Sequence, residues 1–164
     1  MAVAFRGALR TAAFCLALTL AAGGGAGAAC RDDVIDVRGG DAAARFTIEV
    51  ARTEETRARG LMFRETLAAD HGMLFIFDPP RDVAFWMRNT PLPLDIIYID
   101  LAGAVVRIAE NTVPFSETPL PSGATVAAVL EINAGLSRRL GIAPGAQMRH
   151  PAFAGASALW PCGG

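Results

Sequence analysis

The side chains best suited to chemistry lie in and around residues 85–95. Trp86 offers an aromatic stacking face, and Asn89 can both donate and accept hydrogen bonds. Arg64, further upstream, carries a planar guanidinium that fits a carboxylate, a phosphate or a sugar hydroxyl. The sequence therefore predicts a non-catalytic pocket for a small polar or anionic ligand. The predicted lining residues are Arg64, Trp86, Asn89, Thr90, Asp95 and Glu131.

A purely structural role is the alternative for the same residues. Asn89 and Thr90 can tie an irregular turn through hydrogen bonds from side chain to backbone. Arg64 can pair with Asp95 or Glu131 inside the fold. A buried pair of this kind is a costly way to gain stability alone, because both charges lose their water. Both interpretations stay open at the level of sequence.

A second hypothesis is a carboxylate-dependent hydrolase that acts on an envelope glycan. Asp95 and Glu131 would supply the acid and the base, provided that they lie about 5 to 9.5 Å apart across an open cleft. Other hydrolytic motifs are absent from the sequence, including Gly-x-Ser-x-Gly, His-Glu-x-x-His and Cys-x-x-Cys. The chain has no lysine, which excludes Schiff-base chemistry. We predict no cofactor, and whether the protein is an enzyme stays open.

A third hypothesis is Cu(I) handling. His71 and Met73 form one pair two residues apart, and Met148 and His150 form another. On a strand, residues two apart lie on the same face, so each pair can converge. Imidazole and thioether ligands suit Cu(I). In the alternative, the methionines fill the core and the histidines are exposed, and the protein binds no metal.

Residues 1–28 are predicted to be an export signal. Two arginines precede a short apolar run, and a Gly/Ala-rich segment ends in an A-x-A site, so we expect cleavage after Ala28 or Ala29. The run is too short to span a bilayer as a mature helix. Lipid attachment at Cys30 is the alternative, although Gly27 stands where a lipoprotein signal usually has Leu. We therefore expect a periplasmic or secreted protein.

The charge of the mature chain bears on its partners. Without the leader, 13 arginines face 16 acidic residues, a net charge of about −3. A nucleic-acid partner would require a basic surface, so none is expected. No basic amphipathic stretch predicts a helix that lies on a membrane, and we expect no integral membrane segment after cleavage. Oligomeric state is not encoded in any pattern of the sequence.

The two cysteines of the mature chain lie at its opposite ends. In an oxidising compartment, Cys30 and Cys162 could pair and join the termini. Closing so long a loop contributes about 4 to 5 kcal/mol in the chain-entropy model, and less if the ends are already docked. The alternative is two thiols on loose tails. We predict the disulfide, which requires that Cys30 carries no lipid.

Apolar periodicity predicts about eight short strands and two short helices. The expected strands cover residues 32–38, 45–50, 73–77, 83–87, 95–100, 104–109, 125–132 and 147–150. The expected helices cover 53–60, with Thr53 as the N-cap, and 133–140. The absence of a βαβ rhythm favours a mainly β fold, a compact antiparallel β-sandwich or barrel. We expect one domain at residues 29–151, a turn at the diproline, an irregular loop at 111–123, and a loose Ala/Gly-rich tail at 152–164.

Several motifs together resemble one family. They are Arg57-x-x-Gly60-Leu61-Met62-x-Arg64, Gly72-Met73-Leu74-Phe75-x-Phe77, Phe85-Trp86-Met87-Arg88-Asn89-Thr90, Pro93-Leu94-Asp95-Ile96 and Leu130-Glu131-Ile132-x-x-Gly135. The chain resembles the bacterial and archaeal family of domain of unknown function 192 over residues 33–150. The resemblance implies a β-rich, sandwich-like fold, often exported, and no established activity. The family usually has Gly-Asp in the last turn, where this chain has Gly145-Ala146.

Overall fold

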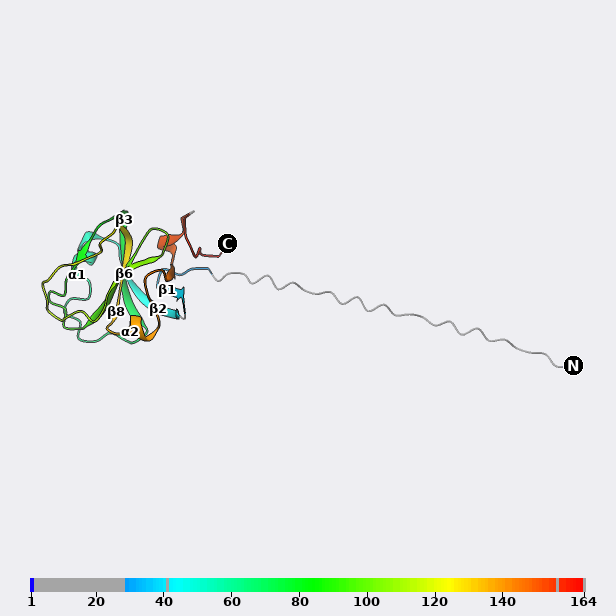
Figure 1. Ribbon diagram of the computed structural model, residues 1–164, viewed down its shortest axis with the longest axis horizontal. Helices are drawn as coiled ribbons and strands as arrows, with labels where there is room; N and C mark the ends of the chain where they lie inside the picture. The colour runs from blue at the N-terminus through cyan, green and yellow to red at the C-terminus, as the bar shows by residue number, and fades with distance from the viewer. Residues whose placement is uncertain (2–28, 41, 156, 164) are drawn as a thin grey trace.

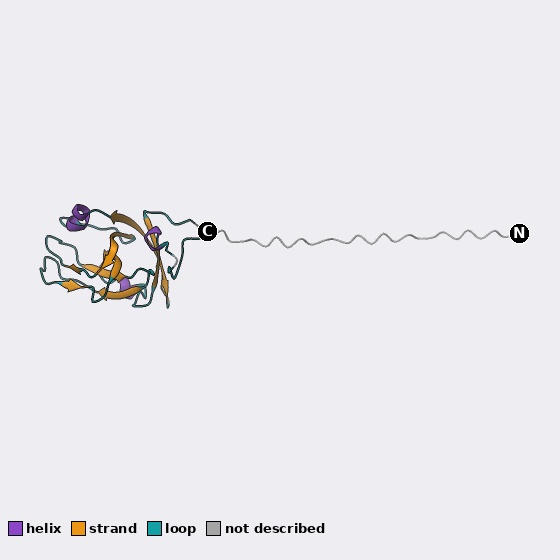
Figure 2. Cartoon of the chain, turned by 90° about the horizontal axis from the view of Figure 1, so that it is seen from above, coloured by secondary structure: helices purple, strands orange, loops and turns teal. Residues whose placement is uncertain are grey.

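The computed structural model describes Met1 and residues 29–40, 42–155 and 157–163, and the predicted signal peptide therefore lies, apart from Met1, outside the described residues. Within the described ranges the protein is mainly β, as the sequence predicts, and its helices are short (Figure 2). The strands are β1 (Val34–Gly39), β2 (Ala42–Ala51), β3 (His71–Arg81), β4 (Ala84–Phe85), β5 (Leu94–Ile99), β6 (Val105–Ala109), β7 (Leu120–Pro121), β8 (Val126–Asn133) and β9 (Gln147–Arg149). The helices are α1 (Glu54–Arg59), α2 (Leu136–Arg139) and the 3-10 helix η1 (Pro151–Phe153).

Seven of the strands form one curled sheet, in the order β6-β5-β8-β3-β2-β1-β9. Its strand pairs are antiparallel except for β2 with β3, which is parallel. The sheet curls into a half-barrel whose two edges meet at one end: the Val105 amide donates to the Ala146 carbonyl at 2.8 Å, and the Met148 amide donates to the Gly103 carbonyl at 2.7 Å. Strands β4 and β7 form a separate two-stranded sheet.

The curled sheet is covered on both faces, which explains why its central strands are apolar throughout. Leu74 of β3 belongs to the cluster on one face, and its neighbours Met73 and Phe75 belong to the cluster on the other. The same alternation places Ile97 on the first face and Tyr98 on the second. Every residue of β5 is buried. The first face is the inside of the curl, and the second carries the candidate site.

The structure contains each predicted element, although the helix expected at 133–140 is shortened to α2 because β8 extends to Asn133, and it corrects two further local expectations. The diproline does not end the strand in a turn, because β3 continues through it to Arg81 with a register shift after Ile76. The loop expected at residues 111–123 contains β7, which pairs with β4 through Phe85 and Leu120. A two-residue strand leaves too few alternating positions for its periodicity to be recognised.

The described part of the C-terminal tail is docked, which corrects the expectation of a loose segment. Cys30 and Cys162 form the predicted disulfide, with their Cα atoms 5.4 Å apart. The guanidinium carbons of Arg38 and Arg149 lie 4.3 and 4.6 Å from the centre of the Trp160 ring. Composition does not reveal these contacts, since a few residues hold the tail, among them Trp160, Cys162 and the buried Phe153. None of the described helices has the length and apolar character needed to cross a membrane.

Candidate functional site

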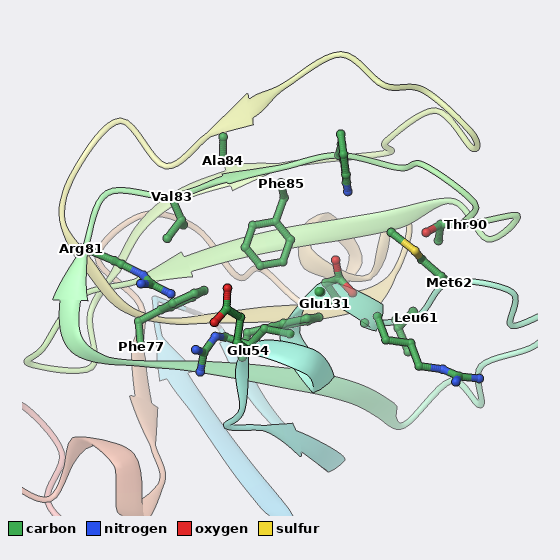
Figure 3. A pocket seen from close by; sticks show the side chains of 16 residues that line it. Glu54, Leu61, Met62, Phe77, Arg81, Val83, Ala84, Phe85, Thr90 and Glu131 are labelled. Atoms are coloured by element: carbon green, nitrogen blue, oxygen red, sulfur yellow. The ribbon is translucent and has the colours of Figure 1, made fainter.

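A cavity of about 430 Å³ lies between α1 and the small β4–β7 sheet, over the second face of the curled sheet. Its floor comes from β3 and β8, one wall comes from α1 and the residues after it, and the other comes from residues 83–86 and Thr90. Figure 3 shows Arg81, Phe77 and Glu54 at one end, and Leu61, Met62 and Thr90 at the other. The lining residues are Glu54, Arg57, Ala58, Arg59, Gly60, Leu61, Met62, Phe75, Phe77, Arg81, Val83, Ala84, Phe85, Trp86, Thr90 and Glu131.

Helix α1 is set against the sheet by its two ends. Thr53 caps the first turn: its hydroxyl accepts from the Thr56 amide, and the Thr56 side chain accepts in return from the Thr53 amide, as the predicted N-cap requires. Gly60 ends the helix at φ 49°, a conformation that costs Gly little. A Cβ atom at Gly60 would lie 3.1 Å from the Phe75 ring. The glycine therefore lets the end of α1 lie directly on the floor of the cavity.

Aromatic rings connect the cavity floor to the small sheet. The Phe85 ring meets the Phe75 ring edge to face, with centroids 5.0 Å apart, and meets the Tyr98 ring at 6.2 Å. The Tyr98 hydroxyl donates to the Leu120 carbonyl at 2.5 Å and so ties β7 to β5. Burial raises the pKa of Tyr98 to about 12, so the phenol keeps its proton at neutral pH.

Two arginines lie at one end of the cavity. The guanidinium carbons of Arg57 and Arg81 lie 5.4 and 5.1 Å from the centre of the Phe77 ring, within cation–π distance. Arg57 also donates to the Ile76 carbonyl at 3.0 Å, which fixes its orientation. The cavity is therefore apolar along its length and cationic at this end, where Glu54 is the acidic lining residue.

Glu131 is the buried titratable group of the cavity. The register of β8 places it between Met73 of β3 and Ile96 of β5, and only 5% of the residue is exposed. The Glu131 carboxyl has no hydrogen bond to another described residue. Every fully buried polar side-chain atom in the described part of the chain has a partner, so the carboxyl oxygens are not fully buried. The carboxyl oxygens therefore face the cavity (Figure 3). Burial raises the pKa of Glu131 to about 8, so the group is mostly protonated at pH 7.

The structure brings three of the six predicted ligand residues together: Trp86, Thr90 and Glu131 line the cavity. Trp86 is 44% exposed, and Thr90 is buried with its hydroxyl donating to the Arg88 carbonyl at 3.1 Å. Arg64 is not a lining residue, because its guanidinium forms a bidentate ion pair with Glu49. This partner differs from both carboxylates that the sequence suggested for Arg64.

Asn89 and Asp95 lie outside the cavity. Asn89 adopts φ 54°, and its backbone carbonyl accepts from the Phe63 amide at 2.8 Å. It therefore shapes the turn through its backbone rather than through the side-chain bonds that the structural alternative expects. Asp95 lies opposite Ile132 on β8, whereas Glu131 lies opposite Ile96. Because side chains alternate along a strand, Asp95 and Glu131 point to opposite faces of the sheet. The acid–base pair of the hydrolase hypothesis is therefore not assembled.

The residues of the Cu(I) hypothesis are also apart. His71 begins β3 and bonds Asp70 through its Nδ1 at 2.8 Å, whereas His150 follows β9, which lies beyond β2 and β1 in the sheet. Both ring nitrogens of His150 are engaged by backbone, at the Ala152 amide and the Asp32 carbonyl. Burial lowers the pKa of His150. Met73 and Met148 belong to the two different core clusters. The described residues contain no cluster of three or more histidine, cysteine or acidic side chains suited to a metal ion.

Sequence reasoning missed the cationic end and most of the apolar lining. Arg57 and Arg81 stand 24 positions apart in the chain and meet only because α1 folds over β3. The one available signal was the Arg57-x-x-Gly60-Leu61-Met62 motif, which contributes four lining residues. Arg81 carries no signal beyond following the diproline.

The fold and the cavity define a small β-rich domain with a ligand-sized site between α1 and the β4–β7 sheet. The sequence model of the DUF192 family, described as "Uncharacterized ACR", matches residues 35–150, and the chain belongs to this family. A crystal structure of a protein of unknown function from Novosphingobium aromaticivorans DSM 12444 is similar, with 49% identity, a TM-score of 0.69, and coverage of 70% of this chain and 82% of that one. A crystal structure described as "a putative transcription regulator" from Sinorhizobium meliloti 1021 has 40% identity, the same TM-score, and coverage of 73% and 94%. No curated protein matches the chain.

Proposed function

We propose that this protein is an exported, non-catalytic binding module for a small polar or anionic ligand, held in the cavity under α1. The observation that carries the proposal is Glu131: a buried carboxyl that faces the cavity and has no hydrogen bond to another described residue. Every fully buried polar side-chain atom in the described part of the chain has a partner, so the Glu131 oxygens are accessible from the cavity and take their hydrogen-bond partner from it. A bound ligand would supply the missing partner.

The remaining lining supports the same function. Ligand sites typically combine mostly apolar walls with a few polar groups that fix orientation, within about 300 to 1,000 Å³. A volume of about 430 Å³, the rings of Phe75, Phe77 and Phe85, and two flanking arginines fit that description. Hydrolysis by Asp95 and Glu131 gains no support, because the two carboxylates lie on opposite faces of the sheet.

Export is part of the proposal and rests on two features. The first 28 residues have the pattern of a cleaved leader, with cleavage after Ala28 or Ala29. The disulfide between Cys30 and Cys162 is of a kind that persists in oxidising compartments such as the bacterial periplasm. The bond is incompatible with lipid attachment at Cys30. The measurement is the N-terminal sequence of the protein recovered from the exported fraction.

Binding is tested by a thermal-shift screen of sugars, organic acids, nucleotides and peptidoglycan fragments. A ligand at 100 times its dissociation constant stabilises the fold by about 2.7 kcal/mol, which raises the melting temperature by several degrees. Hits are confirmed by the fluorescence of Trp86 in a Trp160→Phe background, because these are the two tryptophans of the chain and only Trp86 lines the cavity.

Matched variants locate the binding site. Glu131→Leu removes the hydrogen-bonding group at the cavity floor, and Arg64→Ala changes an arginine outside the cavity. Loss of a hit in the first variant and its retention in the second support the proposal. A hit that survives Glu131→Leu with unchanged affinity places binding elsewhere, and silence across the whole panel contradicts the proposed function.

A further inference from the structure

We infer that the cavity takes an amphipathic organic anion, whose charged group lies against Arg57 and Arg81 and whose uncharged hydroxyl or amide bonds the Glu131 carboxyl. The inference rests on the proposed function and adds the class of ligand, its orientation and a dependence on pH. It follows from three properties of the cavity: the charge at one end, the hydrogen-bonding capacity at the other, and the distance between them.

The charged end has unused capacity to bind an anion. One Nη atom of Arg57 donates to the Arg52 and Ile76 carbonyls, and its other guanidinium nitrogens have no partner among the described residues. Arg81 forms no hydrogen bond or ion pair within the described ranges, although its guanidinium lies over Phe77 (Figure 3). Glu54 is the one acidic lining residue at this end, and Arg59 also lines the cavity. Guanidinium groups bind carboxylate and phosphate oxygens through paired N–H donors.

The Glu131 end requires an uncharged partner. Its neighbours on the same face are Met73, Ile96 and Val129. These side chains offer neither an opposite charge nor a strong hydrogen-bond donor to stabilise an ionised group. A protonated carboxyl offers one O–H donor and an acceptor oxygen. Hydroxyl and amide groups can satisfy both. A ligand that lacks such a group would leave the buried carboxyl unpaired and bind less tightly.

The separation of the two ends sets the length of the ligand. Arg81 lies opposite Val126 on β8, and Glu131 lies five positions further along the same strand. Five positions correspond to roughly 17 Å between backbones, and the two side chains shorten the gap to about 10 Å. A ligand with two fused or linked rings, or an acyl chain of similar length, spans this gap. The apolar lining between the ends matches such a body.

The pH dependence of binding is assigned to Glu131. The charged groups that line the same cavity are Glu54, Arg57 and Arg59 of α1 and Arg81 of β3, and the neighbouring strand β5 contributes Tyr98, whose pKa is raised to about 12. Arginines stay charged at any pH at which the protein is folded. As pH rises past 8, Glu131 loses its proton and adds a negative charge to the apolar cavity that holds the anion. Only the protonated fraction of the protein then binds.

The test is isothermal titration calorimetry of the whole protein with four matched probes. The reference is 4′-(hydroxymethyl)biphenyl-4-carboxylate, which is about 10 Å long, anionic and uncharged at its hydroxyl end. Its carboxamide removes the charge, its 4′-methyl analogue removes the hydroxyl, and 4′-(aminomethyl)biphenyl-4-methanol replaces the anion with a cation. Titration at pH 7 and pH 9, in buffers of different ionisation enthalpy, measures both affinity and proton uptake.

The carboxylate is expected to bind the parent protein at least tenfold more tightly than the carboxamide or the amine. Arg57→Ala and Arg81→Ala remove that preference, and Arg64→Ala, an arginine outside the cavity, retains it. The parent's affinity falls about tenfold from pH 7 to pH 9, with proton uptake on binding at pH 9. Glu131→Gln keeps an uncharged hydrogen-bonding group, so it binds at both pH values without proton uptake.

Three outcomes overturn the inference. If the carboxamide or the amine binds as tightly as the carboxylate, the cavity does not select an anion. If the pH dependence of affinity persists in Glu131→Gln, Glu131 is not the group that titrates. The third is a lack of binding by all four probes. A hit in the wider ligand screen that is lost in Glu131→Leu would still support the proposed function, so the two can fail separately.

Discussion

Two buried carboxylates on neighbouring strands, Asp95 and Glu131, have opposite surroundings. Asp95 is fully buried and accepts four hydrogen bonds of 2.5 to 3.0 Å, from the amides of Asn111, Gly135 and Ser137 and from the Ser137 hydroxyl. Glu131 is 5% exposed and has no hydrogen bond to another described residue. The first joins two loops and the start of α2 to the sheet. The second faces a cavity.

The difference separates residues that hold the fold from residues that form the site. A carboxylate whose oxygens are all bonded stabilises the native state and has no capacity left for a ligand. A carboxyl that burial keeps protonated destabilises the native state at alkaline pH, and the protein gains from it only when a ligand supplies a partner. Burial alone does not distinguish the two roles, and the hydrogen-bond partners do.

The largest expected effect is on stability, at Asp95. Asp95→Ala leaves three backbone donors, of which the Ser137 amide is fully buried, and the buried Ser137 hydroxyl without an acceptor. It is expected to reduce the free energy of unfolding by about 3 to 5 kcal/mol. Urea denaturation at pH 7 measures it. Asp95→Asn, which keeps one acceptor oxygen, is expected to lose less. If Asp95→Ala reduces the free energy of unfolding no more than Glu131→Gln does at pH 7, the contrast between the two carboxyl groups is contradicted.

The next effect is the pH dependence of stability. Because the pKa of Glu131 is raised in the folded protein to about 8, the native state holds more protons than the unfolded state between about pH 4.5 and 8. Its stability therefore falls as pH rises through that range. Glu131→Gln removes this loss, so at pH 9 the variant is expected to melt several degrees above the parent. Parallel melting curves for the two proteins from pH 5 to pH 9 would contradict the buried, unpaired state of Glu131.

A smaller effect is expected at Ser137, which sharpens the account of Asp95. Ser137→Ala removes the hydroxyl bond to Asp95 but keeps the bond from the backbone amide. The expected loss is about 1 to 2 kcal/mol of unfolding free energy. The matched control is Ser116→Ala, because that hydroxyl accepts a 3.3 Å bond from the exposed Thr118 amide. Equal losses in the two serine variants would show that Asp95 does not depend on its buried partners.

The smallest effect is expected at Arg64, the predicted ligand residue that pairs elsewhere. Its ion pair with Glu49 lies at the surface, with 37% and 57% of the two side chains exposed. Such pairs contribute about 0 to 1 kcal/mol. Arg64→Ala is thus expected to change stability by less than about 1 kcal/mol and ligand affinity not at all, as checked by denaturation and calorimetry. A tenfold loss of ligand affinity in Arg64→Ala would show that Arg64 contributes to binding, and would weaken the assignment of the anion to Arg57 and Arg81.

The fold was predictable because its signals are local. Alternation in β2, the apolar β-branched run of β5 and the Thr53 cap of α1 each lie within ten residues, and each appears where the sequence predicts it. The disulfide followed from counting the cysteines of the mature chain. The errors fell where the pattern was too short, interrupted or absent: at β7, at the diproline inside β3 and in the C-terminal tail.

The site was only half predictable because it depends on which face each side chain takes. Asp95 and Glu131 both look like acids in apolar strands, and a single step of register decides that one is bonded within the fold and the other faces the cavity. Likewise, nothing local shows that Arg57 and Arg81 share one ring. Pairing between strands and between α1 and β3 carries that information, and one sequence alone does not contain it explicitly.

The bond between Cys30 and Cys162 also fixes how the molecule can be presented to its surroundings. It brings both ends of the domain to the side that carries β1, whereas α1 lies on the opposite side (Figure 1). Helix α1 forms one wall of the cavity. A surface, a fusion partner or an affinity tag attached at either end therefore leaves the cavity turned outward. When the protein is immobilised through a terminus, the cavity of each copy faces the solution, where a dissolved ligand can reach it.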